Sequence, residues 1–195
     1  MTKFFAAAAA TLLLAPVAAF AQDAAPDAAH DFSGPRLEAR LGYETPTISD
    51  GSGGIWKIGS AVSYGGEAGF DVRAGKNIVV GAYANYELSS VSLCDGGACL
   101  EEKGNLSAGG RLGFIVGDKS LVYVKAGYSR ISFDVKSGTV SGSLSKDGVQ
   151  GSVGFEFGLG KKAYAFVDGS YADYGNFYGI NLQRRQVAGG VGIRF

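Results

Sequence analysis

Hydrophobic and polar residues alternate along most of the chain after about residue 35. In "RLEARLGYE", Leu37, Ala39, Leu41 and Tyr43 share one register, and charged residues fill the other. This period of two predicts a β-strand with one apolar and one polar face. Seven further segments repeat the pattern, at about residues 62–73, 79–88, 106–116, 122–129, 149–157, 165–171 and 187–195. The sequence therefore predicts an all-β protein of eight strands.

Alternation alone fits a soluble β-sandwich as well as a membrane barrel, and the connections separate the two. The segments "RAGKN", "GDKS" and "GLGKK" after the second, fourth and sixth strands are short, whereas the other connections are longer and rich in Gly, Ser and Asp. Short periplasmic turns that alternate with longer extracellular loops are typical of outer-membrane barrels.

Aromatic residues on the apolar face are sorted by type. Tyrosines fall near the outer ends of the strands and phenylalanines near the inner ends: Tyr43, Tyr64, Tyr86, Tyr128 and Tyr171, then Phe70, Phe114, Phe155, Phe157 and Phe195. The core of a sandwich gives no reason for this sorting. Two aromatic girdles at the two membrane interfaces do, because amphipathic rings favour the headgroup level.

The polar face carries eleven charged residues of both signs. They are Arg36, Glu38, Arg40, Glu67, Asp71, Glu87, Arg111, Lys125, Glu156, Asp168 and Arg194. In a soluble protein they would form a solvated surface, whereas in a closed eight-stranded barrel they fill the interior, where they must pair. The combined pattern predicts an eight-stranded antiparallel up-and-down transmembrane β-barrel over residues 35–195.

The N-terminal segment lacks the alternation of apolar and polar residues that marks the barrel strands. Lys3, the apolar run of residues 4–20 and the small-x-small site at residues 19–21 predict a secretory signal peptide over residues 1–21. An N-terminal membrane anchor is the weaker alternative, because the run is short. Residues 22–34 are then a periplasmic tail, in which we expect His30 to be solvated.

The chain resembles the small outer-membrane β-barrels of Gram-negative bacteria, the porin-like group that includes the opacity, OmpX and OmpA-type barrel domains. Three segments carry the resemblance: the last strand, "SYADYG" and "VYVKAGYS". It implies an outer-membrane location, contact with outer-membrane lipid, and insertion by the barrel-assembly machinery. In this chain the insertion signal would be Val191, Ile193 and Phe195. A monomer is expected.

The amino-acid composition supports the strand prediction and argues against one class of partner. Gly is abundant at 32 residues, and with 12 Phe and 10 Tyr it favours strands and tight turns. The formal net charge is zero and no basic stripe is present, so a nucleic-acid partner is not indicated.

Two of the outer connections have features of their own. Cys94 and Cys99 flank a Gly-containing turn in "LCDGGACLEEK", and the oxidising compartment favours a disulfide between them. A metal site there would need further ligands, and none is indicated. The third outer connection, "DVKSGTVSGSLSKDG", is rich in Ser and Gly, which predicts a mobile loop.

Three functions remain open. The favoured one is a structural or surface-interaction barrel whose loops meet a host or cell-surface ligand. A narrow small-solute channel is the alternative, although side chains in an eight-stranded wall leave little bore. A lipid-modifying enzyme fits less well, because the only histidine, His30, lies across the membrane from the outer leaflet. We therefore expect no catalytic residues and no cofactor.

Overall fold

The structure is a computed structural model that describes residues 30–49, 54–57, 59–90, 92–95, 98–137, 140–177 and 180–195. The predicted signal peptide (1–21) and most of the predicted tail lie outside these ranges. The strands are β1 (Gly34–Ser49), β2 (Ile55–Lys57), β3 (Ala61–Arg73), β4 (Ile78–Ser89), β5 (Ser92–Asp95), β6 (Ala98–Val116), β7 (Ser120–Ser137), β8 (Val140–Gly158), β9 (Ala163–Phe177) and β10 (Ile180–Arg194). No helix in these ranges is long and apolar enough to cross a membrane.

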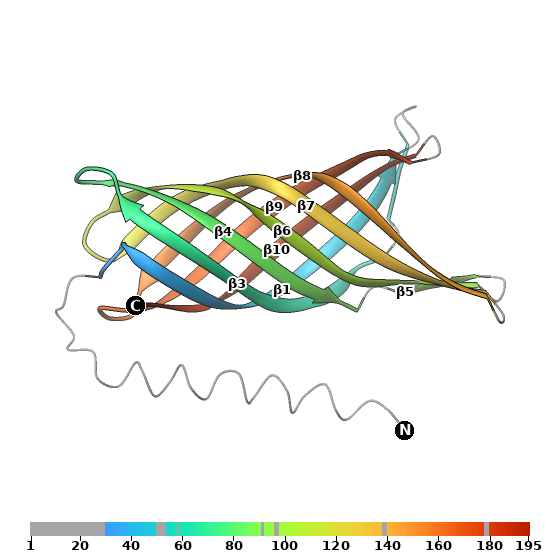
Figure 1. Ribbon diagram of the computed structural model, residues 1–195, viewed down its shortest axis with the longest axis horizontal. Helices are drawn as coiled ribbons and strands as arrows, with labels where there is room; N and C mark the ends of the chain where they lie inside the picture. The colour runs from blue at the N-terminus through green and yellow to red at the C-terminus, as the bar shows by residue number, and fades with distance from the viewer. Residues whose placement is uncertain are drawn as a thin grey trace, which may run out of the picture.

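Eight of these strands form one closed barrel. Each pairs antiparallel with its neighbours in the order β10-β9-β8-β7-β6-β4-β3-β1, and β1 pairs with β10. The predicted eight-stranded antiparallel barrel is confirmed, and its strands wind obliquely around the long axis (Figure 1). The two additional strands are short: β2 pairs with the end of β1, and β5 pairs with β6.

The period-two pattern places the two faces as expected. Large apolar side chains on the outside are exposed, including Leu37, Leu41 and Leu112, whereas the charged register points into the lumen. All ten aromatic residues assigned to the two girdles are exposed on the outer face. These side chains face lipid in the membrane, so exposure here is the condition for burial in the bilayer.

Three short turns close the end of the barrel that carries the phenylalanine girdle. They join β3 to β4, β6 to β7 and β8 to β9, and the C-terminus lies at the same end (Figure 1). Gly117 has a positive φ of 68°, which a residue with a side chain rarely adopts. We call this the inner, periplasmic end, because outer-membrane barrels keep their short turns there.

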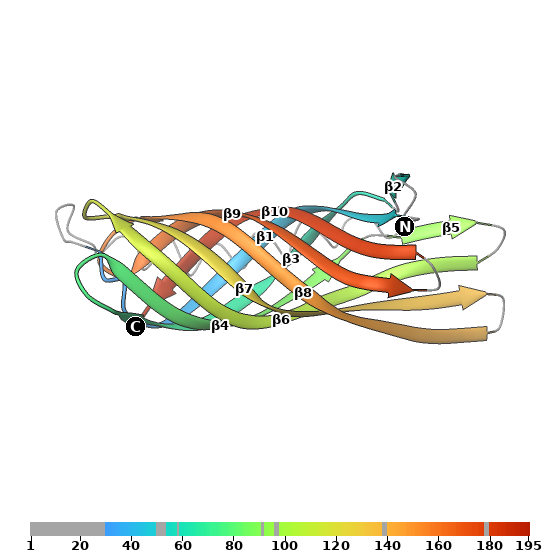
Figure 2. The same cartoon turned by 90° about the horizontal axis from the view of Figure 1, so that it is seen from above.

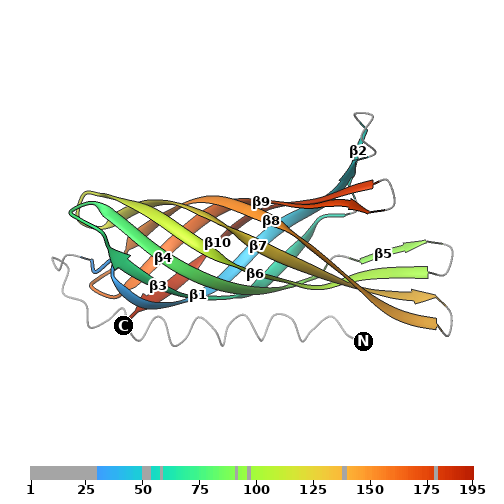
Figure 3. The ribbon, with the colours of Figure 1, turned by 45° about the horizontal axis from the view of Figure 1, so that its top comes forward.

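The third outer connection is a strand pair, not the loop that the sequence predicted. β7 and β8 continue through it as a paired ladder from Ser129↔Gly148 to Ser137↔Val140. Ser and Gly lack bulk but do not prevent backbone pairing once the strands are held in register, so composition alone was misleading here. Figures 2 and 3 show β5 and the outer parts of β6, β7 and β8 extending beyond the barrel wall.

Pairing of β1 with β10 forms the seam of the barrel. The register runs from Arg36↔Arg194 to Ser49↔Asn181, and the Phe195 amide donates a further hydrogen bond of 3.0 Å to the Pro35 carbonyl. The Phe195 ring is 61% exposed on the lipid-facing side. The last residue thus joins the seam through its backbone and the inner girdle through its side chain.

Deleting Phe195 is expected to lower the amount of folded protein in the outer membrane severalfold, because both contacts are lost together. The measurement is the heat-modifiable gel mobility of the protein in isolated outer membranes. Phe114→Ala is the control, since it removes an inner-girdle ring of similar exposure (54%) away from the seam. Equal amounts of folded protein for the two variants would contradict a special role for Phe195.

Candidate functional site

The middle of the lumen is filled by charged side chains. All eleven residues of the predicted charge network are buried there, five of them cationic and six anionic. They come from seven strands, β1, β3, β4, β6, β7, β8, β9, and from Arg194 at the end of β10. The closed barrel brings into one layer residues that lie far apart in the sequence.

Arg40 is the most connected group of this ion-pair layer. Its guanidinium donates to Glu38 Oε2 at 2.9 Å, to Glu87 Oε1 at 3.1 Å and to Asp168 Oδ1 at 2.9 Å. Lys125 Nζ lies 2.9 Å from Glu67 Oε2 and 3.0 Å from Asp168 Oδ2. Carboxylates on β1, β3, β4 and β9 are therefore each paired with at least one of these two cations.

A second group lies nearer the inner end. Asp71 Oδ2 accepts from Arg111 at 2.8 Å and from Arg194 at 2.9 Å, and Glu156 pairs with both arginines. Arg36 joins the two groups, because its Nη1 lies 2.6 Å from Glu38 Oε1 and its Nε lies 3.1 Å from Asp71 Oδ2. The layer forms one continuous network of alternating charge.

Aromatic rings line the same layer. The Arg111 guanidinium carbon lies 4.0 Å from the centre of the Tyr123 ring, and that of Arg194 lies 4.7 Å from the Tyr164 ring. These are cation–π distances, and they fill space that water would otherwise occupy. Burial of so many charges is costly unless each is paired, which makes the network sensitive to loss of any one partner.

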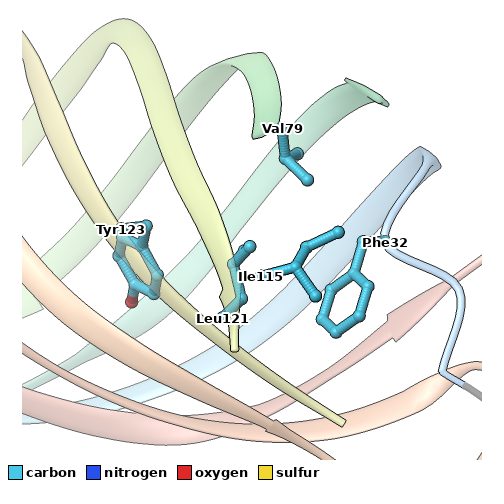
Figure 4. Packing of buried hydrophobic residues seen from close by; sticks show 5 residues of the cluster. All are labelled: Phe32, Val79, Ile115, Leu121 and Tyr123. Atoms are coloured by element: carbon cyan, nitrogen blue, oxygen red, sulfur yellow. The ribbon is translucent and has the colours of Figure 1, made fainter. Parts of the chain in front are cut away.

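The inner end is closed by an apolar group that we call the inner cap: Phe32, Val79, Ile115, Leu121 and Tyr123 (Figure 4). Phe32 precedes the first strand, yet its side chain is 1% exposed among these residues. The segment is held in place by backbone hydrogen bonds from His30 to Asp118 and from Asp31 to Lys161. The residues before β1 thus enter the mouth of the barrel.

The prediction of a solvated His30 is wrong. Its side chain is buried: Nδ1 donates to the Gly160 carbonyl at 2.8 Å, and Nε2 lies 3.3 Å from Glu156 Oε1 and 3.0 Å from Arg194 Nη1. A Cβ on Gly158 would lie 2.6 Å from His30 Cγ, so only glycine leaves room for the ring. The polar composition of the segment gave no sign of this, because the contacts come from turns and strands distant in sequence.

The outer end has its own apolar group, the outer cap: Ile131, Phe133, Ala172, Tyr174 and Leu182. Below it, Asn105 Nδ2 donates to Ser129 Oγ at 2.8 Å and to Tyr174 Oη at 2.6 Å. Apolar groups therefore cover the ion-pair layer at both ends.

Three charged residues between the outer cap and the ion-pair layer were absent from the predicted network. Arg184 pairs with Glu44, and its Nη2 lies 2.9 Å from Glu87 Oε2; Glu102 is 4% exposed nearby. Glu44 and Arg184 continue the inward registers of β1 and β10, so the period-two pattern could have found them. Glu102 escapes the pattern because a bulge between Glu102 and Gly104 reverses the register of β6.

Glu102 lies outside the membrane-spanning part of β6, beyond Leu106, the last lipid-facing residue of that strand on this side. Burial raises the pKa of Glu102 to about 8, and the neighbouring Glu44 carboxylate acts in the same direction. Arg184 lowers the pKa of Glu102, while Glu87 raises it. The group is therefore held mainly protonated at neutral pH.

The register of the strands places the two cysteines relative to each other. Cys94 on β5 lies directly opposite Cys99 on β6, the arrangement that a cross-strand disulfide needs. The disulfide itself stays a prediction, as does the role of Val191, Ile193 and Phe195 in insertion.

Within the described ranges, no group of three or more His, Cys, Asp or Glu residues is arranged to hold a metal ion.

The closed antiparallel barrel, its apolar outer band and its two aromatic girdles define the class: a transmembrane β-barrel of the Gram-negative outer membrane. The chain belongs to the outer membrane protein beta-barrel domain family, whose model matches residues 6–195. The predicted family and location are thereby confirmed. No curated protein sequence matches the chain significantly.

Solved structures share the fold. Neisserial surface protein A is 14% identical over 82% of this chain and 97% of its own, with a TM-score of 0.58. The attachment invasion locus protein Ail of Yersinia pestis, in complex with the heparin analogue sucrose octasulfate, is 12% identical over 82% of this chain and 99% of its own, with a TM-score of 0.53. At these identities the similarity shows the fold alone.

Arg40→Met is expected to lower the free energy of unfolding by about 3–5 kcal/mol, because it leaves several buried carboxylates without their cation. Urea unfolding and refolding in detergent micelles measures the change. Arg130→Met is the matched control: Arg130 pairs with Asp147 on the exposed outer hairpin, where both side chains are more than half exposed, and we expect no measurable change. Equal losses in the two variants would contradict the argument.

Glu102 is expected to make stability depend on pH. Its pKa is about 8 in the folded protein against 4.5 ordinarily, so the folded state binds the proton more tightly. Stability is therefore lost as the pH rises from about 4.5 to about 8. Glu102→Gln removes this loss. The stabilities of the variant and the wild type should therefore differ least near pH 5 and most above pH 8. Urea midpoints in micelles measure the difference. Parallel pH curves for the two proteins would contradict the assignment.

Proposed function

We propose that the protein is a closed outer-membrane anchor that presents a rigid extracellular hairpin to a host or cell-surface ligand. The observation that carries the proposal is the length of β7 and β8. Beyond Tyr128, the last lipid-facing residue of β7, the nine residues Ser129–Ser137 continue as strand, about 30 Å along the strand at roughly 3.3 Å per residue. A structure that only anchors the barrel has no need of this extension.

The extended hairpin is built to hold its shape. Arg130 donates two hydrogen bonds to Asp147, at 2.7 and 3.0 Å, and Ser132 Oγ lies 3.0 Å from Ser145 Oγ across the strands. At the base of the hairpin, the Phe133 side chain packs in the outer cap. Apart from Leu144, the exposed side chains described on this hairpin are polar and of mixed charge, and cross-strand contacts hold them, which suits recognition of a polar surface with little loss of conformational entropy.

The contents of the lumen favour an anchor over a small-solute channel. A permeating ion would have to pass the inner cap, the ion-pair layer and the outer cap in turn. The charges of the ion-pair layer are engaged with one another rather than lining a water path. The narrow-channel alternative would require the caps and the network to rearrange together.

A lipid-modifying activity is less well supported still. His30 is buried at the inner end, with its ring nitrogens engaged by Gly160, Glu156 and Arg194. A general base for outer-leaflet lipid must reach the proton it abstracts, at the opposite end of the barrel. We therefore propose that the protein is not an enzyme.

Binding is tested with a trimmed hairpin in which residues 135–142 are replaced by Asn-Gly, a pair suited to a tight turn between paired strands. The cut keeps Phe133, the outer-cap residue of the hairpin, and its strand partner Leu144. Bacteria that display either protein are assayed for attachment to cultured mammalian cells and to immobilised heparin, the polymer class that the Ail complex suggests as a first probe. We expect attachment to fall to background on trimming, with unchanged heat-modifiable mobility.

Conductance of the refolded barrel in a planar bilayer gives the second readout, and we expect no steady open level. Attachment that survives trimming would overturn the role of the hairpin. A steady open level would overturn the closed anchor and favour the channel.

A further inference from the structure

The lipid-facing surface is hollowed over β8, β9, β10 and β1. A groove of about 620 Å³ lies there, within the range of small-molecule sites. Its floor is Gly151 and Gly169, and its apolar walls include Val153, Val187, Tyr43 and Tyr171. A Cβ placed on Gly169 would meet no atom within 4 Å, which shows that the floor is open rather than covered by a neighbour.

Strand register gives the groove a polar end and an apolar end. Gly151, Tyr171, Arg185 and Thr45 lie side by side in one row across the four strands. The next row toward the membrane centre is Val153, Gly169, Val187 and Tyr43. Because Tyr43 and Tyr171 belong to the outer girdle, the first row lies at the headgroup level of the outer leaflet and the second among acyl chains.

Arg185 differs from two other outward-facing cations near this end, Arg130 and Lys103. Arg130 is paired with Asp147, and Lys103 with Asp134. Among the residues that the structure describes, Arg185 has no carboxylate partner; its guanidinium carbon lies 6.0 Å from the centre of the Tyr171 ring. An unpaired guanidinium at the polar end of an apolar groove complements an anion that carries a hydrocarbon chain.

We propose that this groove binds a phosphorylated lipid of the outer leaflet, with one acyl chain over Gly169 and a headgroup phosphate on Arg185. Guanidinium matches phosphate geometry through paired N–H donors, and the two valines and two tyrosines shield the chain. The site is separate from the extracellular hairpin and does not depend on the function proposed for it.

A second copy of the chain is the competing occupant of the groove. It would bring its own lipid-facing side chains, which are apolar at this level, and would leave Arg185 without an anion. Charge complementarity therefore favours lipid.

The test is native mass spectrometry of the refolded full-length protein in detergent, with added diphosphoryl lipid A. Dephosphorylated lipid A serves as the matched probe without phosphate groups and should be retained less. Arg185→Gln should reduce lipid A retention about tenfold, as loss of one charge-assisted contact predicts. Gly169→Leu should do the same by filling the groove.

Two variants serve as matched controls. Arg130→Gln removes an outward cation that is already paired, and Gly110→Leu adds the same side chain to a lipid-facing glycine on β6, where a Cβ would lie 3.9 Å from its nearest neighbour. Both should retain lipid A as the wild type does. Equal retention by all variants, equal retention of dephosphorylated lipid A, or a dimer that forms in place of the lipid complex would each overturn the proposal.

Discussion

Backbone pairing at membrane depth is the constraint on which the rest of this structure depends. Lipid offers no hydrogen-bond partners, so a sheet that crosses it must have no free edge. The β1–β10 seam meets this requirement, and at eight strands it sets an interior just wide enough for side chains. Closure thus fixes two consequences at once: an apolar outside, and an inside whose contents must satisfy one another.

The charged side chains in the lumen follow from the second of these consequences, that inward-facing groups must satisfy one another. A carboxylate on one strand finds its cation on another only because the barrel is closed, as with Arg40 and Asp168, which are 128 residues apart. The network is therefore both a product of closure and a reason for it to persist, since opening the seam would separate buried ion-pair partners. One apolar cluster lies on each side of the network along the barrel.

Much of this could be predicted from the sequence, because a strand in a barrel alternates between two very different environments. The period of two assigned the inward face of every membrane strand, and with it all eleven residues of the charge network. The same pattern placed the two girdles, since Tyr and Phe occupy different ends of the outward register. These features depend only on local position along a strand.

The predictions that failed depend on contacts that no local pattern records. His30 is buried because two turns, Glu156 of β8 and the end of β10 contact it, and composition marks it only as part of a polar tail. Glu102 points inward because one bulge reverses its register, and the Ser-rich outer hairpin is strand because its partner continues alongside. Arg184, by contrast, lies on the inward register of β10, and extending the alternation would have included it.

The filled lumen also bears on where function can lie. Since the interior charges are engaged with one another, the surfaces left for recognition are those outside the barrel interior. The described residues offer two that differ in chemistry: the outer hairpin of β7 and β8, and the groove beside Arg185, which has no carboxylate partner among them. A barrel fixed by its own seam can vary the outward-facing residues of either surface, Arg185 among them, without removing a partner from the ion-pair layer inside.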